Sequence, residues 1–260
     1  MKHATSADGT PIAFHQTGEG PPVIIVGGAF STAEAGEPLA AALADAGFQG
    51  VTIDRRARGE SGDTSPYAPE REAEDLAAVI EAVGGEASIL GHSSGSVLAL
   101  FAAAQGVPIT QLFLSEPPFH FGEGEPGADL PERLQALVDD GRSEEAVTLF
   151  QREGVGLPDA MIEQITASPM FASLVPLAQS TVYDAVLTRA VSTPTDAMTH
   201  VSQPVTILRG EPTFPVLVRA AELLSQAMPD AEYVIVPESH DHSADPAGTA
   251  REIKRRLTHA

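Results

Sequence analysis

The sequence contains no cysteine, and Lys2 and Lys254 are its only lysines. The absence of cysteine excludes disulfides, thiolate metal sites and a cysteine nucleophile. The residues that follow Met1 lack the apolar core of a signal peptide, and no apolar run approaches the length of a membrane span. We therefore expect a soluble, cytoplasmic protein.

Positive charge is also scarce. The chain carries 36 acidic and 15 basic residues, which gives a formal net charge of −21. Nucleic acid and anionic membranes attract positive surfaces, so we expect neither as a partner. A strongly solvated surface explains the acidity, and adaptation to high salt is the alternative. With 260 residues, the chain has the length of one domain with an insertion.

Short apolar segments of strand length recur along the chain, and most are separated by segments with helical spacing. The continuous apolar run at 22–26 is typical of a parallel strand buried on both faces. This alternation predicts an α/β fold with a doubly wound, mostly parallel sheet of eight strands. The expected strands are 3–6, 11–16, 22–26, 51–53, 87–90, 111–114, 205–208 and 233–236.

The alternation stops near Pro117 and resumes near Val201. Between these positions the segments look helical. One helix start is marked by Asp129, an N-cap residue with Glu132 three positions later. We therefore predict an α/β core at 1–117 and 201–260, and a helical cap at 118–200 between strands 6 and 7.

The segment Gly91-His92-Ser93-Ser94-Gly95 lies between an apolar strand and a helix. This G-x-S-x-G pattern is typical of a nucleophile elbow, in which the serine oxygen is exposed above the sheet. The backbone N–H of the next residue then faces a developing oxyanion. We interpret Ser93 as the nucleophile, and we expect the side chain of His92 to pack beneath the turn.

Two loops that precede the elbow in the chain, at 27–30 and from Asp54 onward, each follow an expected strand and contain candidate site residues. Gly27-Gly28-Ala29-Phe30 follows an apolar strand, where bare backbone N–H groups can approach a ligand closely. We favour an oxyanion role for this loop over that of an ordinary turn. Asp54 resembles a catalytic acid, but it precedes the serine in the chain, and we interpret it as structural.

A serine nucleophile requires a base, and histidine is the usual one because its pKa lies near 7. Two histidines, His240 and His242, follow the last expected strand, and we prefer His240. For the acid that orients the base we prefer Glu116, directly after the sixth strand, to Glu211. The order serine, acid, histidine is that of the α/β-hydrolase elbow enzymes.

Together these motifs resemble the α/β-hydrolase fold superfamily, and in particular its capped serine hydrolases of the esterase or lactonase type. The loop at 27–29 is similar to the oxyanion loop, and Asp54–Gly62 is similar to the turn after the fourth strand. Residues 91–95 match the elbow, and the helical insertion corresponds to the lid. The resemblance covers nearly the whole chain.

The resemblance implies acyl transfer to Ser93, stabilised by the backbone N–H groups of Ala29 and Ser94, and then hydrolysis by water that His240 activates. Serine at position 93 argues against haloalkane dehalogenase or epoxide hydrolase chemistry. The expected substrate is a small or medium carboxylic ester, lactone or thioester, bound without any cofactor or metal by a monomer or small homo-oligomer. Residues expected at the substrate site are Gly28, Phe30, His92, Phe119 and Phe121, although core packing explains the cap phenylalanines equally well.

Three other functions remain open at this point. The same triad supports C–C bond hydrolysis, lyase or perhydrolase chemistry, because a fold does not determine a reaction. A non-catalytic small-molecule binding module is the second alternative. The third is a metal site in the loop from His240 to Asp245, where two histidines and an aspartate lie close together.

Overall fold

The eight predicted strands form one sheet in the order β1-β2-β4-β3-β5-β6-β7-β8. The computed structural model describes residues 1–258. β1 pairs with β2 and β2 with β4 in antiparallel fashion, and all other pairs are parallel. The predicted doubly wound, mostly parallel sheet is thus confirmed. The strands are β1 (Lys2–Thr5), β2 (Pro11–Thr17), β3 (Pro22–Val26), β4 (Gln49–Ile53), β5 (Ala87–His92), β6 (Ile109–Ser115), β7 (Val205–Gly210) and β8 (Glu232–Val236).

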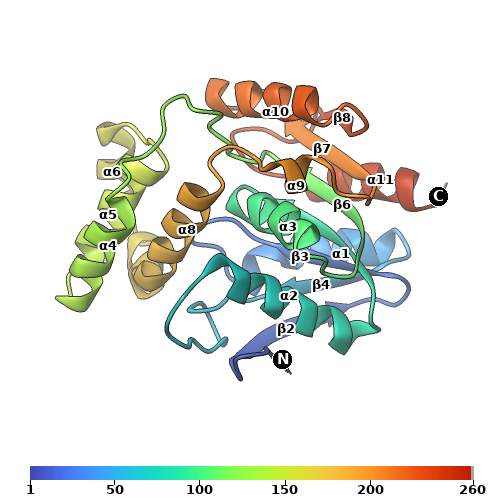
Figure 1. Cartoon of the computed structure of the whole chain (residues 1–260), viewed down its shortest axis with the longest axis horizontal. Helices are drawn as coiled ribbons and strands as arrows, with labels where there is room; N and C mark the ends of the chain where they lie inside the picture. Colours follow the sequence, from blue (N-terminus) through green and yellow to red (C-terminus); the bar gives the residue numbers. More distant parts are fainter. Residues whose placement is uncertain (259–260) are drawn as a thin grey trace.

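Helices cover both faces of this sheet (Figure 1). Helices α2 (Pro69–Val83), α3 (Ser94–Ala104) and α10 (Pro215–Ala227) pack on one face, and α1 (Glu37–Asp45) and α11 (Pro246–Leu257) pack on the other. A short 3₁₀ turn, η1 (Ala33–Gly36), precedes α1. Alternate residues of β3 enter the two apolar clusters, which explains why its run of apolar residues is unbroken.

A helical insertion lies between β6 and β7, as predicted, and it forms an apolar cluster of its own. This cluster also packs against Ala29, Phe30 and Ala57, so the cap lies over the loops that follow β3 and β4. The borders predicted at 118 and 200 remain a prediction. The inserted elements are α4 (Leu130–Asp139), α5 (Ser143–Leu149), η2 (Phe150–Gly154), α6 (Asp159–Thr166), α7 (Phe171–Leu174), η3 (Val175–Leu177), α8 (Ala178–Ala190) and α9 (Asp196–Thr199).

Within residues 1–258, no single helix has both the length and the apolar composition needed to cross a membrane. The segments 159–166 and 171–190 meet that requirement only when they are taken together, and they are bent by 93° relative to each other.

Candidate active site

Ser93 lies at the junction of β5 and α3 with φ 54° and ψ −128°. A non-glycine residue in this region is strained, and such strain is typical of a nucleophile elbow. Close packing of the backbone explains why both elbow positions, 91 and 95, are glycine. A Cβ on Gly91 would lie 2.5 Å from the carbonyl oxygen of Gly95, and a Cβ on Gly95 would lie 2.1 Å from that of Val26. The elbow therefore requires glycine at both positions.

The loop after β3 lies directly against the candidate nucleophile. A Cβ on Gly28 would lie 2.7 Å from Cβ of Ser93 and 3.2 Å from its Oγ. Only a residue without a side chain allows the backbone so close to the serine oxygen. The loop at Gly28 and the start of α3 at Ser94 thus both adjoin Ser93. The role of the Ala29 and Ser94 N–H groups as oxyanion donors stays a prediction.

Glu116 follows β6 and is 3% exposed. Its Oε1 accepts a hydrogen bond of 3.0 Å from the backbone N–H of Gly210, at the end of β7. Its Oε2 accepts a hydrogen bond of 2.6 Å from Nδ1 of His242. Burial opposes ionisation of this carboxyl, but the His242 and Gly210 hydrogen bonds together hold its pKa below the usual value.

The structure corrects the preference for His240. It brings His242 to Glu116, whereas His240 is exposed. The loop turns sharply here, because Asp241 and His242 have φ of 50° and 59°. The N–H of Ser243 donates to the carbonyl of His240 at 2.9 Å and closes the turn. This reversal of the backbone directs His242 inward, so His242 replaces His240 as the candidate base.

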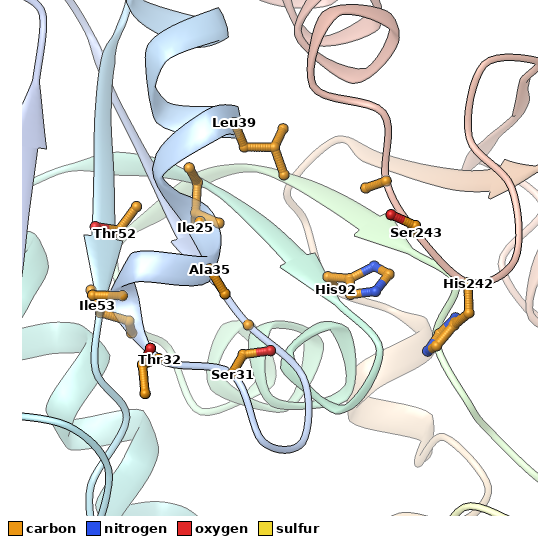
Figure 2. A pocket seen from close by; sticks show the side chains of 14 residues that line it. Ile25, Ser31, Thr32, Ala35, Leu39, Thr52, Ile53, His92, His242 and Ser243 are labelled. Carbon is orange, nitrogen blue, oxygen red and sulfur yellow. The ribbon is translucent and has the colours of Figure 1, made fainter. Parts of the chain in front are cut away.

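A pocket of about 160 Å³ opens beside His92 and His242 (Figure 2). Ser31 and Thr32 line it on one side, and Ser243 lines it on the other. The ring of His92 lies 4.8 Å from that of His242, centroid to centroid, and its Nδ1 shares a hydrogen bond of 3.1 Å with Oγ of Ser115. His92 therefore contributes to the pocket wall as well as supporting the elbow.

Burial, with the neighbouring charge of His242, lowers the pKa of His92 to about 4. His92 is consequently neutral at pH 7. A neutral imidazole at this position avoids a second positive charge beside His242 when that ring accepts a proton.

The expected substrate-contacting phenylalanines are dispersed. Phe30 packs edge-to-face against Phe150 of the cap, with 5.6 Å between ring centroids. Phe119 is 2% exposed and belongs to the large core cluster, and Phe121 packs against that cluster. Phe119 is thus a core residue.

Asp54 and Glu211, the two other acidic residues that resemble a catalytic acid in the sequence, form no hydrogen bond with His242 within residues 1–258; Asp54 binds backbone N–H groups. Asp54 is buried and accepts hydrogen bonds from the N–H groups of Ala33 and Glu60 at 2.6 and 3.0 Å. It holds the turn after β4, in agreement with its structural interpretation. Glu211 is exposed, and its backbone N–H donates to the carbonyl oxygen of Ser239 at 2.7 Å.

A buried charge cluster beside the elbow was not predicted from the sequence. Arg55 forms a two-pronged ion pair with Glu72 of α2, at 2.6 and 2.8 Å. Both Arg55 and Arg58 reach Asp184 of the cap helix α8, at 2.9 and 2.7 Å. The sequence does show a run of arginines after β4 in a chain with few cations. Nothing in the sequence indicates that Asp184, 126 residues after Arg58, is their partner.

The loop from His240 to Asp245 is the alternative metal site that the sequence suggests. Across residues 1–258, no group of three or more histidine, aspartate or glutamate side chains is arranged to hold a metal ion. Nδ1 of His242 is engaged with Glu116 instead.

Comparisons with known proteins identify the fold and the family of this chain. A crystal structure of an alpha/beta hydrolase from Sphaerobacter thermophilus is 41% identical, with a TM-score of 0.90 over 98% of this chain and 99% of that one. The 2-(acetamidomethylene)succinate hydrolase of Mesorhizobium japonicum is 28% identical over 233 residues, which cover 87% of this chain and 83% of the relative. An esterase from Thermogutta terrifontis shares the fold at 20% identity, with a TM-score of 0.68 over 99% and 96% of the chains. The model of the alpha/beta hydrolase family matches residues 23–252, and the chain therefore belongs to that family.

Proposed function

We propose that the protein is a serine hydrolase that cleaves a small or medium carboxylic ester, lactone or thioester through an acyl-enzyme on Ser93. The observation that carries the proposal is the 2.6 Å hydrogen bond from His242 to Glu116 beside the elbow. An ionised carboxylate accepts but does not donate, so Nδ1 of His242 carries the proton. Nε2 is then free to accept the proton of Ser93.

In the first half-reaction, Oγ of Ser93 attacks the carbonyl carbon while His242 takes the hydroxyl proton. The carbonyl oxygen becomes an oxyanion, which the N–H groups of Ala29 and Ser94 stabilise. The bond to the leaving group then breaks, and His242 returns the proton to the departing alcohol or thiol. Glu116 stabilises the imidazolium throughout, because its charge and its hydrogen bond favour the protonated ring.

In the second half-reaction, water replaces the alcohol. His242 removes a proton from the water as its oxygen attacks the acyl carbon, and the bond to Ser93 breaks. The serine recovers its proton from His242, and a carboxylic acid is released. No cofactor takes part in these steps.

The pocket beside His92 and His242 favours a small substituent on the substrate. Its volume of about 160 Å³ is similar to that of a cavity that binds benzene, about 150 Å³. The hydroxyl groups of Ser31, Thr32 and Ser243 along its wall suit a partly polar group rather than a long acyl chain.

A panel of p-nitrophenyl esters, lactones and thioesters tests the substrate class. We expect turnover to fall as the acyl chain lengthens beyond about four carbons, since the pocket is small. A fluorophosphonate should label Ser93, and Ser93→Ala should abolish both labelling and turnover. Undiminished ester hydrolysis by Ser93→Ala would refute the mechanism.

Replacement of each histidine in turn tests the base. His242→Asn should lower kcat/KM for a p-nitrophenyl ester by about a thousandfold, because general-base catalysis typically contributes 10²–10⁴. His240→Asn, two positions away in the same loop, is the matched control and should stay within about threefold of the wild type. The opposite ranking would return the base to His240.

An amide is a second candidate substrate, favoured by the similarity to the 2-(acetamidomethylene)succinate hydrolase. The same residues would act, with an amine as the leaving group. Release of acetate from an N-acetyl enamide dicarboxylate, with weak activity on every ester, would favour this alternative. C–C hydrolysis, lyase and perhydrolase activities require substrates of their own and are distinguished from ester hydrolysis by their products.

A further inference from the structure

The carbonyl of Gly28 has an unusual partner for a loop next to a nucleophile. Nη1 of Arg58 donates to it at 2.5 Å and also to the carbonyl of Ser31 at 3.2 Å. Arg58 is 2% exposed. A buried guanidinium is thus fixed on the outer side of the turn that follows β3.

The position of this carbonyl determines the direction of an N–H group. The C=O of Gly28 and the N–H of Ala29 are opposite ends of one planar trans peptide. When Arg58 holds the carbonyl, the N–H of Ala29 is held in the opposite direction. A charge-assisted hydrogen bond to the carbonyl also polarises the amide, which makes its N–H a stronger donor.

Arg58 is in turn held by the cap. Its Nη2 donates to Oδ2 of Asp184 at 2.7 Å, and Asp184 is 0% exposed in the middle of α8. The other carboxylate oxygen, Oδ1, accepts from the hydroxyl of Ser94 at 2.8 Å and from Nη1 of Arg55 at 2.9 Å. A single cap carboxylate is therefore connected to both peptides that flank Ser93.

The charges in this cluster balance. Two guanidinium groups, Arg55 and Arg58, face the carboxylates of Glu72 and Asp184. Burial opposes ionisation of Asp184, but the charges of Arg58 and Arg55 keep its pKa below the usual value. Asp184 is consequently an anion, and neutralising it would leave a buried guanidinium without its partner.

We propose that Asp184 is a positioning residue that acts from the cap, through Arg58 and the hydroxyl of Ser94, to align the two oxyanion donors. This inference rests on the proposed function. It assigns the cap helix α8 a part in transition-state stabilisation. Donors aligned before reaction are what an oxyanion hole requires.

The test compares Asp184→Asn with Asp75→Asn. Asp75 is also buried and also pairs with an arginine, Arg56, at 2.7 and 2.8 Å, but this pair lies between α2 and the turn after β4 and contacts neither Gly28 nor Ser94. The matched variant therefore carries a similar loss of a buried ion pair without touching the oxyanion donors.

For Asp184→Asn we expect kcat on the best ester to fall about 10- to 100-fold with KM within about threefold, since loss of a whole oxyanion donor costs about 10²–10³. The sharper readout is the ratio of kcat/KM for an oxoester to that for the matching thionoester, whose sulfur is a poor acceptor from the oxyanion donors. This ratio should fall at least about fivefold in Asp184→Asn and stay within about twofold in Asp75→Asn.

Ser94→Ala and Arg58→Lys carry the same test if Asp184→Asn does not fold. Ser94→Ala keeps the backbone N–H and removes only the hydroxyl that Asp184 holds, and it should lower the oxoester to thionoester ratio in the same direction. An unchanged ratio in these variants, or an equal fall in Asp75→Asn, would overturn the positioning role while leaving the hydrolase intact. Absence of ester turnover and of Ser93 labelling in the wild type would instead refute the proposed function and the inference with it.

Discussion

Four residues of the candidate site have a left-handed backbone that side chains disfavour. Ser93, Glu116, Asp241 and His242 have φ of 54°, 50°, 50° and 59°. Each costs about 1–3 kcal/mol and persists only where the surroundings determine it. The sharp turns direct the hydroxyl, the carboxylate and the imidazole toward the same end of the sheet, where the ring of His92 also lies.

The neutral state of His92 leads to a stability prediction. The folded protein holds its pKa near 4, below the ordinary value of 6.5, so the unfolded chain binds this proton first as the pH falls. The stability that neutral His92 contributes is fully present above pH 6.5 and is lost as the pH falls toward 4. Between pH 7.5 and 4.5, the free energy of unfolding should drop about 2 kcal/mol more in the wild type than in His92→Asn.

Urea denaturation at the two pH values measures this difference. His92→Asn keeps a polar group near Ser115. For each protein, the free energy of unfolding at pH 4.5 is compared with its own value at pH 7.5, where the side chain at position 92 is neutral in both. Equal losses in the two proteins would show that His92 is charged in the folded state.

At the scale of elements, the site depends on how closely β3, β5 and α3 approach each other. The elbow brings Gly95 against the carbonyl of Val26 at the end of β3, and the next loop brings Gly28 against Ser93. Since β3 and β5 are paired in parallel, their carboxyl ends lie side by side and both loops open at the same edge. The glycines make the oxyanion loop and the nucleophile adjacent.

Gly95→Ala tests this close approach. The added methyl would lie 2.1 Å from the carbonyl oxygen of Val26, so either β3 or α3 must move. We expect the free energy of unfolding to fall by about 3 kcal/mol, at the upper end of ordinary overpacking. Gly127→Ala in the exposed loop before α4 is the control and should change it by less than about 0.5 kcal/mol. Urea denaturation at pH 7.5 checks both, and a neutral Gly95→Ala would mean that the elbow tolerates a wider separation.

For the whole molecule, the surplus of negative charge lies on the surface. Only three of the 15 basic and five of the 36 acidic residues are buried, and the buried groups are paired or hydrogen-bonded. A surface of one sign repels itself and destabilises the folded state. Exposed ion pairs such as Arg133 with Glu153 offset this only weakly, because each contributes at most about 1 kcal/mol.

Salt should therefore stabilise the protein. Raising NaCl from 20 to 500 mM shortens the screening length from tens of ångströms to a few, which weakens long-range repulsion more than short ion pairs. We expect the free energy of unfolding to rise by about 1 kcal/mol or more, measured by urea denaturation. KCl at the same ionic strength should act equally, since screening does not depend on the cation. A decrease with salt would indicate that local ion pairs dominate.

Local pattern was enough to predict the sheet, the helical insertion and the elbow. Apolar runs of strand length, helical spacing and the glycines around Ser93 are short-range features, and each acts on the backbone within a few residues. Glu116 was selected by its position after the sixth strand, and in the structure it contacts a histidine of the expected loop.

The choice between His240 and His242 needed the tertiary structure, because two left-handed residues in the loop decide which imidazole turns inward toward a carboxylate 126 positions away. The contact of Asp184 with Arg55 and Arg58 likewise joins segments more than 120 residues apart. Local propensity carries no information on such contacts. Residue order determined which chemistry is available to this chain. The turn after β8 and the packing of the cap on the sheet decided which side chains meet.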